Sequence, residues 1–265
     1  MGRKLFDIVA DRKLKNPNSI LLAAKEAGTW RTYNAQEVWD TATAMAYSLQ
    51  EKGIQYKKSL DQVDTVAIIS GNRPEWIITD LATQLSGGVL TPIYPTVSVA
   101  ELAYIFNEAQ VKIVFVANQE LYDRFLPAFK LVPSLQFIYS YDTVEGVAHW
   151  SNLISSENHI SKEAIAKIDD ESLATIIYTS GTTGNPKGVM LSHKNIVSNI
   201  EDSIRYFSFT DGIDKKALSF LPLNHIFERM CTYLYFEKGI SIYYAESMET
   251  IGDNLKEVKP VVFTT

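Results

Sequence analysis

Short apolar runs rich in β-branched residues recur at nearly even intervals along the first half of the chain, and they limit the possible folds more than any other feature. They fall at 64–69, 89–93, 112–117 and 135–140. Helical patterns lie between them, with start signals such as Pro74 in a first turn and a capping box formed by Ser98 and Glu101. Strands that alternate with helices predict a parallel sheet with right-handed crossovers. The predicted fold class is therefore α/β.

A second series of strands and helices follows a polar stretch. Residues 142–172 are rich in Ser, Asn, Asp, Glu and Lys and show little periodicity, which indicates a connection. Beyond it we expect strands near 173–178, 217–221 and 240–245, and helices near 193–207, 226–237 and 248–258. The predicted organisation is a first α/β lobe at 1–150, a connection at 151–172 and a second α/β lobe at 173–265. Because 261–265 indicates the opening of another buried strand, we expect the second lobe to be cut short there.

The bulk composition excludes several classes of protein. With 265 residues, 46% apolar residues and a net charge of −6, the chain can form a core but offers no broad basic surface for nucleic acid. Its single cysteine, Cys231, excludes a disulfide framework and a cysteine-rich metal cluster. The first residues contain no apolar run long enough for a secretory signal and no run of roughly 18 apolar residues occurs in the sequence, so we expect neither a signal peptide nor a membrane span. We expect a cytoplasmic protein, while peripheral membrane contact and the oligomeric state stay open.

The most informative stretch follows the predicted strand at 173–178. Three glycines, four hydroxyl residues and one lysine fall within Thr179–Gly188. Small residues let backbone N–H groups turn toward a polyphosphate, hydroxyls add donors or a metal ligand, and Lys187 supplies a full charge. A Walker A loop is excluded, because Lys187 is preceded by Pro186 and followed by Gly188. The loop predicts a triphosphate site, and a flexible surface turn is the alternative for a loop of this composition.

The order of residues in this loop resembles the signature of the adenylate-forming superfamily, which contains acyl-CoA synthetases, luciferases and peptide-synthetase adenylation domains. Further blocks resemble this superfamily in similar order: Trp30–Tyr33 with Glu37, Asn72–Trp76, Gly87–Thr96 and Leu221–Arg229. The last block is similar to that of long-chain fatty acyl-CoA ligases. The resemblance covers almost the whole chain. It implies the large amino-terminal domain of these enzymes, with parallel-rich sheets, helices on their faces and two lobes, in truncated form.

The resemblance also implies a reaction in two steps. A fatty carboxylate attacks the α-phosphate of ATP and releases pyrophosphate, and the thiol of coenzyme A then captures the acyl adenylate. The implied contacts of the β- and γ-phosphates are Thr179, Ser180, Gly181, Thr182, Thr183 and Gly184. Lys187 would neutralise charge, Thr179 would bind Mg²⁺, and His225 would line the acyl or adenylate pocket. Lys187 and His225 are thus the predicted catalytic residues.

Other residues carry more than one interpretation. Glu228 would either contact substrate or orient its loop by pairing with polar neighbours. We expect His193 to be a polar residue in a first helical turn, and His149 and His159 to be solvated. One helix face could line an acyl channel or pack into the core: Ile226, Phe227, Met230, Tyr233 and Leu234.

Three functions remain open at this point: a long-chain acyl-CoA ligase, an adenylation module that loads a carrier protein, and a non-catalytic nucleotide-binding domain. The first would use a fatty acid, ATP and coenzyme A as its small-molecule partners. The acidic and lysine residues of the superfamily's later blocks have no counterpart in this sequence. We therefore expect the 265-residue chain to be inactive by itself.

Overall fold

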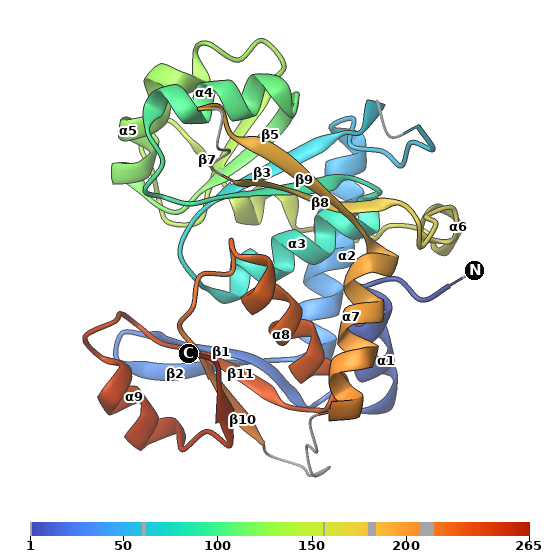
Figure 1. Ribbon diagram of the computed structural model, residues 1–265, viewed down its shortest axis with the longest axis vertical. Helices are drawn as coiled ribbons and strands as arrows, with labels where there is room; N and C mark the ends of the chain where they lie inside the picture. The colour runs from blue at the N-terminus through green and yellow to red at the C-terminus, as the bar shows by residue number, and fades with distance from the viewer. Residues whose placement is uncertain (1, 60–61, 156, 180–183, 207–214) are drawn as a thin grey trace.

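The computed structural model describes residues 2–59, 62–155, 157–179, 184–206 and 215–265. Two β-sheets lie above one another in Figure 1, with helices between them and on their outer faces. The described parts therefore form alternating layers of helices and sheets, as the predicted α/β class requires.

The larger sheet has seven strands in the order β7-β6-β5-β3-β4-β8-β9. Its described neighbours pair in parallel except for the antiparallel pair β8–β9, and the expected strands of the first series are all present. The strands are β3 Thr65–Ile69, β4 Val89–Ile93, β5 Val111–Val116, β6 Phe137–Ser140, β7 Ala148–His149, β8 Leu173–Thr179 and β9 Lys187–Ser192.

The smaller sheet has five strands in the order β12-β10-β11-β1-β2. Its strands are β1 Ile20–Glu26, β2 Thr29–Asn34, β10 Lys216–Ser219, β11 Ser241–Tyr244 and β12 Val262–Phe263. Strands β1 and β2, which the sequence patterns did not predict, form an antiparallel hairpin through Ala27 and Gly28. Both turn residues have positive φ, 49° and 80°, which suits the tight turns that join twisted strands.

The expected division into lobes at 1–150 and 173–265 does not describe these sheets. Strands β8 and β9 lie beyond the expected connection, yet β8 pairs with β4 in the larger sheet. Conversely, β1 lies near the start of the chain and pairs with β11 in the smaller sheet. Each sheet thus combines early and late segments, because strand pairing depends on spatial neighbours and not on distance along the sequence. The segment 151–172 also contains most of the 3-10 helix Trp150–Leu153 and the short helix α6, Lys162–Ala166.

The helices explain why both faces of the larger sheet are apolar. Along β3, Val66 and Ile68 face the core shared by the two sheets, whereas Ala67 and Ile69 face an outer cluster. The inner layer contains α2 Ala35–Glu51, α3 Pro74–Ser86 and α8 Ile226–Glu237, and α4 Val99–Glu108 and α5 Gln119–Phe129 cover the outer face. Strands buried on both faces read as continuous apolar runs, which is why the sequence revealed them.

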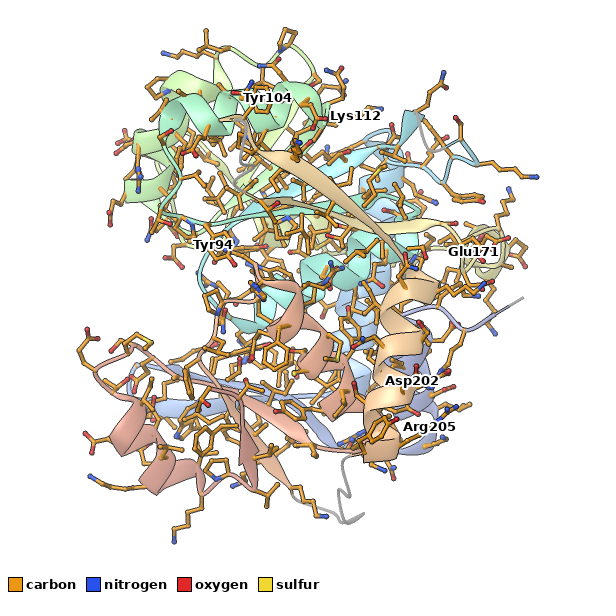
Figure 2. The ribbon with its side chains drawn as sticks, in the orientation of Figure 1. Tyr94, Tyr104, Lys112, Glu171, Asp202 and Arg205 are labelled. Carbon is orange, nitrogen blue, oxygen red and sulfur yellow. The ribbon has the colours of Figure 1, made fainter. Side chains whose placement is uncertain are left out.

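The remaining helices complete the layers. Helices α1 Asp7–Lys15 and α7 His193–Tyr206 both contact α8, while α9 Ile251–Val258 covers the outer face of the smaller sheet. Helix α7 exposes Asp202 and Arg205 on its outer side (Figure 2). The predicted capping box of α4 is confirmed, since Ser98 and Glu101 exchange both hydrogen bonds. Within the described residues, no helix combines the length and apolarity needed to cross a membrane.

Candidate active site

The predicted phosphate loop is held by the antiparallel hairpin of β8 and β9. Thr179 and Lys187 are directly opposed residues of this pair, so their side chains project from the same face of the sheet. Both side chains are exposed. The hairpin therefore places a hydroxyl and an ammonium group side by side at the mouth of the loop. Ser180, Gly181, Thr182 and Thr183 lie outside the described residues.

Two glycines of the loop have different structural reasons. Gly184 has a φ of 98°, a conformation that residues with a side chain rarely adopt. Gly188 lies opposite Tyr178, and a Cβ at this position would come within 2.8 Å of the Ile176 Cγ2 and 3.1 Å of the Tyr178 Cζ. Gly188 is thus required by packing within the hairpin, a role that the sequence did not reveal.

A cleft lies beside this hairpin. It has a volume of about 430 Å³ and includes Thr179, Pro186, Tyr178 and Tyr94 in its lining; Tyr94 is labelled in Figure 2. Burial raises the pKa of the Tyr94 hydroxyl above its ordinary value. The described end of the phosphate loop therefore opens onto a space with aromatic and hydroxyl groups.

His225 is the residue that caps the amino end of α8. Its Nδ1 accepts a hydrogen bond from the backbone N–H of Phe227 at 3.2 Å, and the backbone N–H of His225 donates to the carbonyl of Pro222 at 2.9 Å. The imidazole is exposed. The capping bond occupies one ring nitrogen and fixes the direction of the ring, leaving the other ring nitrogen directed away from the helix end.

Three blocks that the sequence analysis matched separately meet in front of this helix. Asn72 donates to the carbonyl of Leu221 at 2.7 Å and accepts from the N–H of Leu223 at 2.9 Å. Asn224 accepts from the Trp76 indole at 3.1 Å and donates to the carbonyl of Ile93 at 2.8 Å. The tertiary structure thus brings these blocks into one hydrogen-bond network, which no spacing in the sequence could predict.

Glu228 is buried at the carboxyl ends of the strands of the smaller sheet. Only 1% of the residue is exposed, and its two carboxylate oxygens accept bonds from Ser219 at 2.6 Å and Thr264 at 2.5 Å. Burial raises the pKa of this carboxyl, although the two hydroxyl bonds oppose the shift. Of the two interpretations left open for Glu228, this geometry favours pairing with polar neighbours.

Arg229 forms a buried ion pair between two helices. Its Nε and Nη2 bind the two carboxylate oxygens of Asp80 in α3 at 2.9 and 2.5 Å, and both side chains are fully buried. Tyr233 donates to the same carboxylate at 2.8 Å, and Gln84 donates to it at 2.9 Å. The pair thus fixes α8 against α3, next to the segment 221–225 that ends at His225. Arg229 lies within a block that resembles the superfamily, whereas nothing in the sequence pointed to a role for Asp80.

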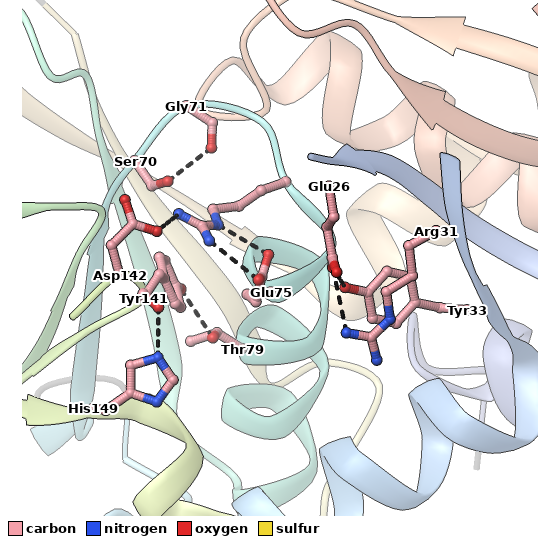
Figure 3. Close-up of polar contacts among 11 residues, drawn as sticks. Glu26, Arg31, Tyr33, Ser70, Gly71, Glu75, Thr79, Tyr141, Asp142 and His149 are labelled. Atoms are coloured by element: carbon pink, nitrogen blue, oxygen red, sulfur yellow. Dashed lines mark hydrogen bonds and ion pairs between the residues drawn. The ribbon is translucent and has the colours of Figure 1, made fainter. Parts of the chain in front are cut away.

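A second polar cluster follows β3 at the junction of the two sheets. Arg73 binds both carboxylate oxygens of Glu75, at 2.9 and 3.1 Å, and the carboxylate of Asp142 at 3.0 Å. Figure 3 shows Glu75, Asp142 and Tyr141 in this cluster, and the guanidinium lies 5.1 Å from the centre of the Tyr141 ring. These contacts hold the segment that carries Asn72. They also border a cavity of about 560 Å³ between the carboxyl ends of β1, β3 and β11.

The other histidines and the cysteine are held by packing or by hydrogen bonds to other segments of the chain. His193 is only 1% exposed, and its Nδ1 accepts from the N–H of Leu5 at 3.3 Å, so it is a core residue and not merely a polar first-turn residue. His149 and His159 bond to Tyr141 and Thr43 respectively, at 2.7 and 2.9 Å. Burial raises the pKa of the Cys231 thiol to about 12. Across the described ranges, no three His, Cys, Asp or Glu side chains are grouped as a metal site.

Comparison with known proteins defines the class. Over residues 10–265 the chain matches the AMP-binding enzyme family, and it belongs to that family. The fold is shared with the amino-terminal domain of FACL13 from Mycobacterium tuberculosis, with a TM-score of 0.83 at 16% identity over 99% of this chain and 62% of that one. It is also shared with the luciferase-like enzyme of the mealworm Zophobas morio, with a TM-score of 0.82 at 20% identity over 98% of this chain and 59% of that one.

Within this family, the chain is similar in sequence to enzymes named as long-chain-fatty-acid–CoA ligases. The chain is 33% identical over 254 residues to long-chain-fatty-acid–CoA ligase 5 of Mus musculus, covering 89% of this chain and 36% of that protein. It is 31% identical over 255 residues to long-chain-fatty-acid–CoA ligase 1 of Homo sapiens, covering 88% of this chain and 35% of that protein. The chain thus spans about a third of the length of these relatives.

Proposed function

We propose that the protein containing this chain activates a long-chain fatty acid with ATP and transfers the acyl group to coenzyme A. The observation that carries this proposal is the pairing of Thr179 with Lys187 at the mouth of the Gly/Thr-rich loop. Membership of the AMP-binding family supports the nucleotide chemistry, and the relatives named as long-chain-fatty-acid–CoA ligases support the acid and the thiol.

The loop residues act on the phosphates. Attack of a carboxylate on the α-phosphate requires two anions to approach, and charge develops on the departing pyrophosphate. The ammonium of Lys187 neutralises that charge, while Thr179 and the loop to Gly184, including Ser180, Gly181, Thr182 and Thr183, donate to the β- and γ-phosphates. No protein nucleophile is needed, because the carboxylate itself attacks.

The donor set near Thr179 also fits ATP-bound Mg²⁺. The exposed Thr179 hydroxyl lies next to Lys187, and no three-residue metal cluster accompanies it in the described part of the chain. We expect the phosphates to hold the ion and Thr179 to be its protein ligand, because Mg²⁺ in such sites is usually coordinated by few side chains. When bound, the ion withdraws charge from the phosphate oxygens.

His225 and α8 act at the acyl end of the substrate. The exposed imidazole at the head of α8 binds the carboxylate or adenylate, and Glu228 serves this pocket by holding the loop in place. Tyr233 and Leu234 are buried in the core, whereas Ile226 and Met230 are half-buried and Phe227 is 44% exposed. Only the latter three of this helix face remain as candidates to line an acyl channel.

The decisive experiment is ATP–pyrophosphate exchange with acetate, octanoate and palmitate. It should use a chain extended to the length of the relatives, since we expect the 265-residue chain by itself to form no acyl-CoA. Each buried methylene contributes about 0.8 kcal/mol to binding, so the kcat/KM of exchange with palmitate should exceed that with acetate by several orders of magnitude. A preference for acetate or an aromatic acid would refute the long-chain assignment, and absence of exchange with every acid would refute adenylation. Release of the acyl group to a carrier protein instead of coenzyme A would favour the adenylation module.

A further inference from the structure

We propose that Asn72 is a positioning residue, which sets His225 relative to the phosphate loop across the junction of the two sheets. This inference rests on the proposed function of His225 and Lys187. Asn72 lies in the connection between β3 and α3 and is far from both residues in sequence. It touches neither the phosphate loop nor the imidazole in the described structure, so its effect must pass through the backbone of 221–225.

The Asn72 amide holds the backbone on both sides of Pro222. Its Nδ2 donates to the carbonyl of Leu221 at 2.7 Å and to the Ser219 hydroxyl at 3.2 Å, and its Oδ1 accepts from the N–H of Leu223 at 2.9 Å. An amide is suited to this task, because it presents a donor and an acceptor at once. The single side chain of Asn72 therefore binds the backbone of the segment that leads to His225 at two points.

The same segment is held at a second point. Asn224 accepts from the Trp76 indole at 3.1 Å and donates to the carbonyl of Ile93 at 2.8 Å, and both Trp76 and Asn224 are almost fully buried. Ile93 is the last residue of β4. The residue immediately before His225 is thus bound to the end of a strand of the larger sheet.

These contacts have a common consequence. Strand β3, which leads to Asn72, pairs with β4, and β4 pairs with β8, the strand that ends at Thr179. The segment 221–225, in contrast, follows β10 of the smaller sheet. Asn72 and Asn224 therefore fix the position of the segment 221–225, which follows a strand of the smaller sheet, relative to the larger sheet, which carries the β8–β9 hairpin. An error of about 1 Å in such a position can reduce a rate on the order of 100-fold.

The first test uses hydrogen exchange of the 265-residue chain and needs no activity. Asn72→Ala leaves the N–H of Leu223 and the carbonyl of Leu221 without this partner, so amide exchange in a peptide spanning 221–225 should rise about tenfold or more. Exchange within the later turns of α8 should stay unchanged. Asn118→Ala is the matched control, because it removes an amide that caps α5 by a 3.0 Å bond to Leu121. Unchanged exchange at 221–225 in Asn72→Ala would overturn the proposal.

The second test uses pyrophosphate exchange by the longer protein. Asn72→Ala should lower kcat roughly 10- to 100-fold with little change in the KM for ATP, whereas Asn118→Ala should leave kcat within about twofold. In a double-mutant cycle, Asn72→Ala should have little further effect once His225→Ala is present. Additive effects would overturn the positioning role. Absence of exchange in the unsubstituted protein would instead refute the proposed function, and the hydrogen-exchange result would still decide whether Asn72 orders the loop.

If Asn72→Ala fails to fold, Asn72→Asp provides the second variant. It keeps an oxygen that can accept from the Leu223 N–H but replaces the donor to the Leu221 carbonyl with a second oxygen. We expect the same loss of kcat in a folded protein, with exchange rising in the peptide of 221–225. A folded Asn72→Asp protein with unchanged kcat and exchange would overturn the proposal as well.

Discussion

Single side chains at the candidate site divide into those that face solvent and those that face the core. Lys187 and His225 are exposed, whereas Glu228 is only 1% exposed. Exposed groups can be replaced with little loss of packing, so changes in activity at these positions report chemistry. Buried groups affect the free energy of unfolding first, and substitutions there must be compared with a stability measurement.

Lys187→Ala should lower the rate of adenylate formation while the free energy of unfolding changes by less than about 0.5 kcal/mol. The reason is that an exposed ammonium contributes little to packing, whereas in the proposed mechanism it neutralises the charge on the leaving pyrophosphate. Pyrophosphate exchange by the longer protein and urea unfolding are the two measurements. Lys130→Ala, at another exposed lysine, is the control. Exchange equal to that of the control would remove Lys187 from the mechanism.

His193 should make the stability of the chain depend on pH. Burial, with the nearby charges of Arg229 and Lys4, lowers the pKa of this histidine from 6.5 to about 3. Between these two pH values His193 binds a proton in the unfolded chain but not in the folded chain. The contribution of His193 to the free energy of unfolding is therefore fully present above pH 6.5 and decreases as the pH falls toward 3. The slope from this residue is at most about 1.4 kcal/mol per pH unit.

The measurement is urea unfolding between pH 4 and pH 7 for the chain with His193→Asn. An asparagine oxygen can replace the ring Nδ1 as acceptor for the Leu5 N–H but does not titrate. The variant should lose the pH dependence assigned to His193, and the control His159→Asn, at an exposed histidine, should retain it. If the unsubstituted chain and both variants showed the same dependence of the free energy of unfolding on pH, the assignment to His193 would be contradicted.

At the scale of elements, α3 and α8 are joined by the buried pair of Asp80 and Arg229. Helix α8 carries His225 at its head, and α3 follows the Asn72 segment, so this pair holds together the two elements that the proposed mechanism uses. Desolvation makes such a pair a poor source of net stability, but it also makes either partner costly to leave alone.

Arg229→Met should therefore destabilise the chain by about 3–5 kcal/mol, because Asp80 would remain buried without its cation. Adding Asp80→Leu to that variant should recover part of the loss. The matched control is Arg205→Met, which breaks the exposed pair with Asp202 on α7 and should cost about 0–1 kcal/mol. Chemical denaturation of these variants, together with Asp80→Leu alone, measures these differences. A double variant that loses as much as the sum of its single substitutions would show that the two groups are not coupled.

At the scale of the whole molecule, the two sheets exchange segments from both ends of the chain. Strand β1 pairs with β11, and β8 pairs with β4, so neither the first 150 residues nor the last 93 contain one complete sheet. The core cluster shared by the sheets likewise includes residues from β1, α3 and α8. Folding of the two sheets should consequently be cooperative.

A segment of 173–265 expressed alone should not fold. It lacks β4, the neighbour of β8, and β1, the neighbour of β11. Circular dichroism and the dispersion of amide NMR signals would reveal this, with the 265-residue chain as the control. Cooperative unfolding of the isolated segment would contradict the interleaved arrangement and restore the division first predicted at 151–172.

The sequence predicted the parts of the fold that depend on local patterns. Central strands such as β3 and β5 are buried on both faces and therefore appear as apolar runs, and α4 begins at a capping box that is visible in the sequence. Strand β2 escaped prediction because it lies at a sheet edge and is mostly exposed, so it has no continuous apolar run.

By itself, the sequence predicted the α/β class and the family and marked the Gly/Thr-rich loop as a candidate phosphate site, because backbone propensity, burial patterns and a contiguous motif are all local properties. Only the tertiary structure decided that Asn72, Trp76 and Asn224 hold one loop, that Asp80 pairs with Arg229, and that each sheet joins distant segments. Such contacts form when the packing of apolar faces brings remote strands and helices together. Their partners are therefore set by the geometry of the layers and not by spacing along the chain.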